Sequence, residues 1–224
     1  MIELDSVRAM AKKEEVSPEV VVMENYQMTV LNEMSEFGVA KNLVFKGGTA
    51  LRLGYQAWRF SEVLDFSVLG KISFGEFKRM MVSVAKRYQE MEVDDIYNRK
   101  NTLFARLVVQ AGKWRGGVKV EISKRQEKWV SGKDYDYKML KSPVSWLQPY
   151  IRIVTLGRIY KDKLRLVEER KKPRDWFDLW FLAQKLDKKF SKKVRVDKKL
   201  MVDRVRFLLP KSKRFILDEF EYEN

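Results

Sequence analysis

The sequence contains no cysteine and no histidine among its 224 residues. The lack of cysteine excludes disulfide bonds and thiolate metal sites. The lack of histidine removes the commonest general base and the commonest transition-metal ligand. Acid–base or metal chemistry must therefore rely on Asp, Glu, Lys, Ser or Tyr, and carboxylates favour hard ions such as Mg²⁺.

Long apolar runs are also missing. No run approaches the roughly 20 residues that a membrane-spanning helix needs, and the opening segment Met1–Asp5 is too polar for a signal peptide. Hydrophobic residues make up 45% of the chain and charged residues 34%, a balance typical of a globular protein. We therefore expect a globular protein of the cytoplasm with no membrane contact.

Positive charge is concentrated in the second half of the chain. The net charge is +15, of which residues 1–135 carry +4 and residues 136–224 carry +11. This asymmetry indicates a polyanionic partner such as a nucleic acid, because each phosphate neutralised by Lys or Arg releases a bound counterion. The alternative interpretation is a lysine-rich solvated surface that binds nothing.

The hydrophobic pattern changes along the chain from mixed strands and helices to helices alone. Helices are predicted at residues 17–37, 73–90, 155–169, 174–185 and 197–209, and strands at residues 43–45, 63–69, 102–110 and 118–122. Pro143 and Pro149 punctuate the intervening loop. We predict an α/β sheet domain at residues 1–140 and a basic helical domain at residues 141–224.

A glycine-rich turn, Lys46-Gly47-Gly48-Thr49, follows the first predicted strand and precedes a short helix. Glycines let backbone N–H groups approach a phosphate closely, and a helix N-terminus adds partial positive charge. The alternative is an ordinary tight turn in which glycine is needed for a positive φ. The spacing does not match a Walker A motif, so no P-loop is predicted.

Two acidic residues lie in predicted strands. Asp65 follows Val63 at a spacing of two, which places both side chains on one face of a strand. Glu121 interrupts an apolar strand, where an unpaired carboxylate is costly. Paired-metal phosphoryl transfer uses carboxylates at such positions, so Asp65 and Glu121 are candidate metal ligands. The alternative for Glu121 is a salt bridge on a solvated sheet face.

The helical half contributes a third group of candidates. Lys163 is a candidate ligand of a triphosphate, and Asp175 and Asp178 lie on one face near a helix start. The residues alone favour capping and ion pairing with neighbouring arginines for these two acids. The candidate nucleic-acid contacts near them are Arg170, Lys171, Lys172 and Arg174.

Together these segments resemble the AbiEii/AbiGii-type nucleotidyltransferase toxins of type IV toxin–antitoxin systems. The resemblance covers about residues 40–185 and depends on the order and spacing of the motifs. The matching segments are Lys46-Gly47-Gly48-Thr49-Ala50-Leu51, Arg59-Phe60-Ser61-Glu62, Asp65-Phe66-Ser67, Val118–Ser123, Lys163-Leu164 and Lys172-Pro173-Arg174-Asp175-Trp176-Phe177-Asp178.

The resemblance implies a fold related to DNA polymerase β, with a mixed sheet, flanking helices and a C-terminal helical domain. It also implies Mg²⁺ as cofactor, an NTP as cosubstrate, RNA (most often tRNA) as acceptor and an antitoxin as partner. The nucleotide-binding residues that it implies are Gly47, Gly48, Thr49, Ser61 and Lys163. The catalytic residues that it implies are Asp65, Glu121, Lys163, Asp175 and Asp178, with Asp65 and Glu121 as metal ligands.

The sequence departs from the family pattern at Val63, where the family has the first Asp of Asp-x-Asp. An ideal strand points Glu62 to the opposite face, so Glu62 is not expected to replace it. Natural loss of activity, engineered inactivation and a bent strand that recruits Glu62 are the three explanations that the sequence leaves open.

Three hypotheses follow for function. The first is a nucleotidyltransferase toxin that modifies RNA, whose activity Val63 puts in question. The second is a non-catalytic protein of the same fold that binds nucleotide or RNA, with Val63 as the mark of lost chemistry. The third, a DNA-binding regulator, depends on charge alone, since no helix-turn-helix pattern is present.

Overall fold

The computed structural model describes residues 3–112, 114–170 and 172–223. Its helices are α1 (Leu4–Lys13), α2 (Pro18–Ser35), α3 (Gly47–Tyr55), α4 (Phe74–Lys86), α5 (Leu156–Glu169), α6 (Pro173–Lys185) and α7 (Lys198–Val205), with 3₁₀ turns η1 (Gly38–Asn42), η2 (Arg206–Leu208) and η3 (Lys211–Asp218). Its strands are β1 (Leu43–Lys46), β2 (Val63–Val68), β3 (Met91–Arg99), β4 (Thr102–Ala111), β5 (Trp114–Ser123), β6 (Tyr135–Met139), β7 (Tyr150–Val154), β8 (Lys193–Val194) and β9 (Glu221–Tyr222).

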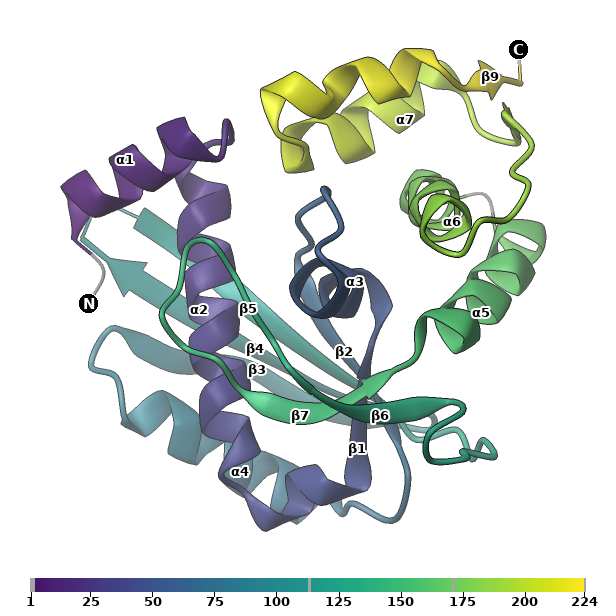
Figure 1. Cartoon of the computed structure of the whole chain (residues 1–224). Helices are drawn as coiled ribbons and strands as arrows, with labels where there is room; N and C mark the ends of the chain where they lie inside the picture. The colour runs from purple at the N-terminus through teal and green to yellow at the C-terminus, as the bar shows by residue number, and fades with distance from the viewer. Residues whose placement is uncertain (1–2, 113, 171, 224) are drawn as a thin grey trace.

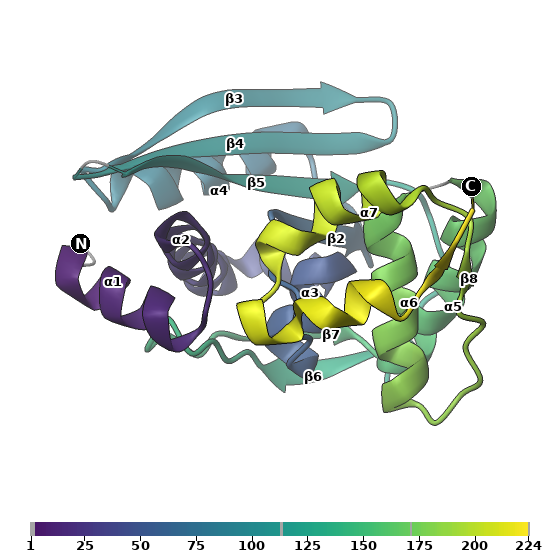
Figure 2. The same cartoon turned by 90° about the horizontal axis from the view of Figure 1, so that it is seen from above.

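A mixed sheet of seven strands forms the centre of the described chain, in the order β3-β4-β5-β2-β1-β7-β6. The pairs β1·β7 and β2·β5 are parallel, and the other pairs are antiparallel. Helices α2 and α4 pack on one face, and the C-terminal helices α5, α6 and α7 gather over the other (Figures 1 and 2). This arrangement confirms the predicted mixed sheet with flanking helices and a C-terminal helical part.

Local sequence signals explain the main helices. The side chain of Ser73 accepts a hydrogen bond from the Glu76 backbone N–H, and the Glu76 carboxylate accepts one from the Ser73 N–H, which is the predicted capping box of α4. Thr155 caps α5 in a similar way. Pro18 lies in the first turn of α2, where its missing N–H leaves no hydrogen bond unmade.

The boundary between the two parts differs from the prediction. Strands β6 and β7 complete the sheet, so the sheet extends to Val154 rather than ending near residue 140. Strand β3 and helix α1 were not predicted. The outermost strands β3 and β6 carry mixed polar and apolar residues because one edge and much of their surface face solvent. Sequence periodicity is therefore weak in both. No helix in the described ranges is both long and apolar enough to cross a membrane.

The two parts share packing. Leu208 of η2 belongs to the main hydrophobic core with residues of α2, β2 and β4. The backbone N–H of Phe60, just before β2, donates to the Leu208 carbonyl at 2.9 Å. These contacts hold the C-terminal segment against the entrance to β2.

A buried ion pair fixes α3 against α2. Arg52 Nε donates to Glu24 Oε2 at 2.9 Å, and the Arg52 guanidinium lies 3.8 Å from the centroid of the Phe60 ring. The Ser142 hydroxyl donates to Glu24 Oε1 at 2.7 Å and links the loop before β7 to the pair. The exposed fraction is 1% for Glu24 and 9% for Arg52, so each charge depends on the other for its solvation.

We predict that Glu24→Gln lowers the free energy of unfolding by about 3–5 kcal/mol, because the buried Arg52 then keeps only the more distant Glu14, at 4.0 Å, as a counter-charge. The double variant Glu24→Leu, Arg52→Met removes both charges and should lose less than the sum of the two single changes. Urea unfolding followed by circular dichroism gives both values. Additive losses would contradict the dependence of each charge on the other.

Candidate functional site

Asp65 of β2 and Glu121 of β5 are direct register partners in a parallel pair of strands. Direct partners project on the same face of a sheet, so the two carboxylates lie side by side, as the strand phase predicted. Lys46, the last residue of β1, is the partner of Asp65 on its other side. A row of three charged residues therefore crosses the middle of the sheet.

The glycine turn packs directly on this row. Gly47 has φ of +79°, and a Cβ at this position would lie 2.5 Å from Asp65 Oδ2. A Cβ on Gly48 would lie 2.4 Å from Arg59 Nη2 and 2.9 Å from Ser61 Oγ. Both positions therefore require glycine for close packing, and the N-terminus of α3 lies beside Asp65. No side chain caps the N-terminus of α3.

A cavity of about 640 Å³ lies above the row. This volume is within the usual range for small-molecule sites. The lining residues come from the glycine turn, the segment that leads into β2, strand β5 and helices α5, α6 and α7: Gly48, Arg59, Ser61, Glu62, Val63, Asp65, Glu121, Lys163, Arg170, Lys172, Pro173, Arg174, Asp175, Asp178, Leu200 and Arg204.

A chain of buried ion pairs forms one wall of this cavity. Arg59 donates to Asp178 from Nη2 at 2.7 Å and from Nε at 3.1 Å. Lys163 Nζ donates to Asp178 Oδ2 at 2.6 Å and to Asp175 Oδ1 at 2.7 Å. Arg170 Nε donates to Asp175 Oδ2 at 2.8 Å. The network joins the entrance to β2 with α5 and α6. Asp175 pairs with the neighbouring Arg170 as expected, whereas Asp178 pairs with Arg59 and Lys163 instead of a neighbouring arginine.

The pKa values follow from these contacts. Burial alone would lower the pKa of Lys163, but the carboxylates of Asp178 and Asp175 raise it above its usual value. Burial opposes ionisation of Asp175, yet Lys163 and Arg170 hold its pKa below the usual range. Lys163 is therefore a permanent cation. Two of its three N–H donors bind carboxylates.

Asp65 behaves in the opposite way. Burial raises its pKa to about 7, and the neighbouring Glu121 adds to this rise, while Lys46, Lys163 and Arg170 act against it. No ion pair between residues that the structure describes involves Asp65 or Glu121, and two adjacent acids form a favourable position for a cation. Among the described residues, however, no group of three or more acidic side chains is arranged to hold a metal ion.

Glu62 differs from its predicted placement. Strand β2 begins at Val63, and Glu62 lies at a bend before it, so strand alternation does not determine its direction. Glu62 lines the same cavity as Val63 and Asp65, and its carboxylate is paired with Arg174 of α6. The predicted orientation toward the opposite face is therefore wrong, although the ion pair with Arg174 engages the carboxylate.

Only some of the other predicted nucleotide ligands line the cavity. Gly48 and Ser61 line the cavity. Thr49 is fully buried, and its hydroxyl donates to the Val63 carbonyl at 2.5 Å, so this side chain anchors β2. The backbone of Gly47 packs on Asp65.

Of the predicted nucleic-acid contacts, Arg170 and Arg174 are engaged in the ion pairs already described, and Lys172 is exposed at the cavity rim. Lys171 lies outside the described residues. Arg59, Lys46 and Arg204 also belong to this site, and no role was predicted for them from the sequence. Arg59 pairs with a residue 119 positions away, and no local pattern indicates such a contact.

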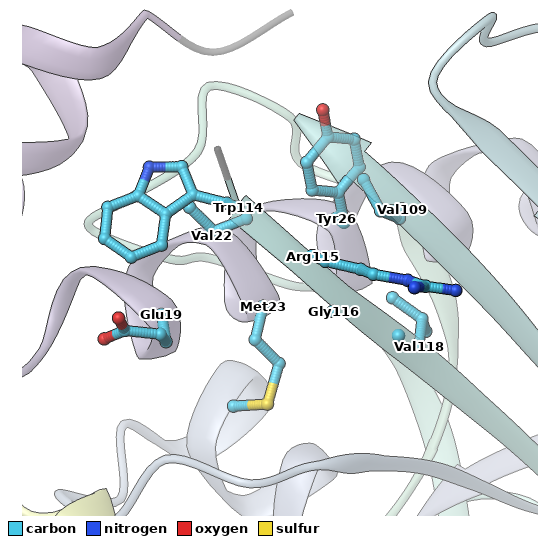
Figure 3. Close-up of a pocket in the computed structure, with 10 residues that line it drawn as sticks. Glu19, Val22, Met23, Tyr26, Val109, Trp114, Arg115, Gly116 and Val118 are labelled. Carbon is cyan, nitrogen blue, oxygen red and sulfur yellow. The ribbon is translucent and has the colours of Figure 1, made fainter. Parts of the chain in front are cut away.

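A second, smaller cavity lies between the start of α2 and the β4–β5 hairpin (Figure 3). Its volume is about 50 Å³, and its lining includes the apolar side chains of Val22, Met23, Val109 and Val118. It contains none of the predicted site residues, so the chemistry indicated by the sequence belongs to the larger cavity.

We predict that Asp178→Asn lowers the free energy of unfolding by about 3–5 kcal/mol, because Arg59 and Lys163 are both buried and lose their shared counter-charge. Asp175→Asn should cost less, since Lys163 keeps Asp178 and Arg170 is 42% exposed. Glu168→Gln, in an exposed pair with Arg195, is the control and should change stability by less than about 1 kcal/mol. Chemical unfolding of the three variants tests this order; equal losses for the two aspartates would contradict it.

A second prediction concerns pH. Because the pKa of Asp65 is raised to about 7 in the folded protein, the folded state binds more protons than the unfolded state between about pH 4 and pH 7. Stability from this group therefore falls as pH rises through that window. Asp65→Asn should be more stable than the parent by roughly 1–3 kcal/mol at pH 8, with the difference vanishing near pH 4. Thermal unfolding across this range measures it.

The control for the pH series is Asp203→Asn, which changes an exposed acid on α7. Its stability difference from the parent should not vary over the same window. A constant difference for Asp65→Asn would show that the fold does not raise the pKa of Asp65.

Comparison with known proteins identifies chains of similar fold. JHP933 from Helicobacter pylori, known from a crystal structure, is 26% identical with a TM-score of 0.55, covering 79% of this chain and 71% of that chain. MenT4, a nucleotidyltransferase toxin from Mycobacterium tuberculosis, has a TM-score of 0.59 over 90% of this chain and 68% of its own; at 18% identity the likeness concerns the fold. No curated protein gives a significant match.

The family is shown by a match over most of the chain. A family model described as nucleotidyl transferase AbiEii toxin, type IV toxin–antitoxin system, matches residues 29–221. The matched range includes the glycine turn, both acidic strands and the ion-pair wall, and it confirms the resemblance inferred from the motifs. The chain belongs to the AbiEii nucleotidyltransferase toxin family of type IV toxin–antitoxin systems.

Proposed function

We propose that this protein transfers a nucleotide from an NTP to an RNA, with tRNA as the leading acceptor, and that Val63 slows the reaction. One observation carries the proposal: the adjacent carboxylates of Asp65 and Glu121 face a glycine turn beneath a buried lysine in a cavity of about 640 Å³. Family membership supports the reaction class and implies an antitoxin as partner.

The chain's own groups suit a triphosphate. The uncapped N-terminus of α3 offers backbone N–H groups beside Asp65. Lys163 has one N–H donor beyond the two bound to carboxylates, and we assign it to a phosphate oxygen. Exposed Lys172 at the rim adds positive charge at the entrance. Asp175 and Asp178 act by holding Lys163 and Arg59 in place.

The donor set fits one Mg²⁺ ion. Mg²⁺ in phosphoryl-transfer sites binds to one or two carboxylates together with substrate phosphates and water, and Asp65 and Glu121 supply two adjacent carboxylates. A bound Mg²⁺ would lower the pKa of the acceptor hydroxyl and offset the charge of the triphosphate. The raised pKa of Asp65 means that cation binding and loss of its proton are coupled.

A second candidate function is nucleotide binding without turnover. Val63 occupies the place of a third carboxylate, and the ion pair with Arg174 engages Glu62, the acid that precedes it in the sequence. A site with two carboxylates can retain one metal ion and a nucleotide while lacking the second metal of a paired-metal reaction. Incorporation of labelled NTP into RNA distinguishes the two functions.

We predict that Val63→Asp raises nucleotide transfer to RNA at least about a hundredfold, because it restores a carboxylate two residues from Asp65 on the same strand face. The variant should also bind NTP more tightly in Mg²⁺, and its expression should slow bacterial growth. Transfer of radiolabelled nucleotide to total tRNA measures the gain, with Val63→Asn as the matched control that adds a polar side chain without charge.

The opposite outcome has a defined meaning. An active parent chain whose transfer does not increase in Val63→Asp, and is lost in Glu62→Gln, would show that Glu62 leaves Arg174 and supplies the third carboxylate. A parent and a Val63→Asp variant that both bind NTP without transferring it would support the second function.

A further inference from the structure

The row of charged residues at the site continues outward across the sheet. Glu121 is the register partner of Phe104 in β4, and Phe104 is the partner of Tyr97 in β3. Direct partners share a face of the sheet, so Phe104 and Tyr97 project on the same face as Asp65 and Glu121. Strands lie about 4.8 Å apart, which places the two rings one and two strand spacings beyond Glu121.

This face of β3, β4 and β5 is open. The alternate residues of these strands, including Leu103, Ala105 and Val120, are buried against α2 and α4 on the other face. Figure 2 looks onto the open face, with β3 and β4 uncovered in front of α4 and α7 lying beside them over β2. The two aromatic side chains are therefore partly exposed beside the cavity rather than buried in the core.

The two rings form a stacked platform. The Phe104 and Tyr97 centroids are 4.7 Å apart with an interplanar angle of 15°, and the Arg99 guanidinium lies 4.5 Å from the Tyr97 centroid. Parallel rings with an adjacent guanidinium form the kind of surface on which unpaired bases stack, since every base has a π-face. Neither burial nor an ion pair within the sheet requires aromatic residues at these partly exposed positions.

We infer that Phe104 and Tyr97 are a stacking subsite for the unpaired end of an RNA whose terminal hydroxyl lies at the Asp65–Glu121 pair. This inference rests on the proposed function, because the acceptor must reach those carboxylates. Phe104 stacks on the base next to the reacting end, Tyr97 supports that stack, and Arg99 contacts the backbone. Unpaired bases are favoured over a duplex, whose bases are already stacked.

The charge of the open face fits this occupant. Lys119 lies two residues from Glu121 on the same face of β5 and is exposed. Arg106 is paired with Asp94, and Asp95 is its register partner, so this part of the face is close to neutral. Positive charge therefore flanks the rings on β5 and at Arg99. Glu121 is an acidic residue directly beside the rings, and we assign it to metal binding.

The chain provides a matched control at the opposite edge of the same sheet. Tyr137 and Tyr150 are also stacked, with centroids 5.3 Å apart and an interplanar angle of 19°, and they are 43% and 60% exposed. They lie on β6 and β7, outside the row that contains Asp65 and Glu121. A general affinity of exposed tyrosines for RNA would involve this pair equally.

The test is fluorescence anisotropy with a labelled single-stranded RNA of about ten nucleotides, compared with a blunt duplex of the same sequence. Phe104→Leu keeps the apolar volume but removes the ring, and it should weaken single-strand binding about five- to a hundredfold with little effect on the duplex. Tyr97→Phe should bind as the parent does, whereas Tyr97→Leu should be weakened. Tyr137→Leu should bind as the parent does.

Two results would overturn the inference: unchanged binding in Phe104→Leu, or an equal loss in Tyr137→Leu. Retained RNA binding together with lost binding of a co-expressed protein would show that the platform serves a protein partner instead, and would also overturn it. NTP binding by Phe104→Leu, measured by calorimetry, should equal that of the parent. Absent nucleotide transfer with a ring-dependent loss of RNA binding would refute the proposed function alone and leave the stacking subsite standing.

Discussion

The ion pair between Arg59 and Asp178 is the interaction on which the site depends. It joins a residue at the entrance to β2 with one on α6, 119 positions later, and both side chains are 3% exposed. A buried guanidinium and a buried carboxylate are costly alone, so the fold is stable only when the helical part is seated against the sheet. Lys163 shares the same carboxylate, and thus α5 is fixed by the same contact. The glycine turn is part of this constraint, because a side chain at Gly48 would collide with Arg59.

The buried cations of the site are paired with acids of α6, whereas the two acids of the sheet, Asp65 and Glu121, lie next to each other. Asp178 and Asp175 are fully occupied by Arg59, Lys163 and Arg170, whereas Asp65 lies beside Glu121 with a pKa raised to about 7. A protein shaped by stability alone would place an apolar or paired residue at position 65. The acid at position 65 lowers the stability of the folded protein, and binding of a cation or a phosphate–metal complex at Asp65 would offset this loss. Active sites commonly sacrifice stability for function in this way.

The parts of this structure that depend on local periodicity could be predicted from the sequence. Strand phase together with the order of the motifs placed Asp65 and Glu121 on one face of the sheet, and the capping signals at Ser73 correctly placed the start of α4. Prediction failed for edge strands of the sheet and for positions that are determined by contacts between residues far apart in the sequence. Edge strands such as β3 and β6 lack a clear alternation, and the position of Glu62 depends on a bend before β2 that no spacing rule describes. Arg59 could not be identified from its neighbours, because its partner lies in another part of the chain.

The bend at Glu62 changes the meaning of Val63. In an ideal strand the loss of the first acid would leave the site one carboxylate short, with Glu62 facing away. In this fold Glu62 faces the same cavity and is paired with Arg174, whose Nε also donates to the Arg204 carbonyl at the end of α7. A triphosphate entering between Lys172 and Arg174 would compete for that guanidinium with a stronger charge and more acceptor oxygens. Glu62 therefore lies in the same cavity as Val63, and its ion pair with Arg174 determines whether this carboxylate is available to the site.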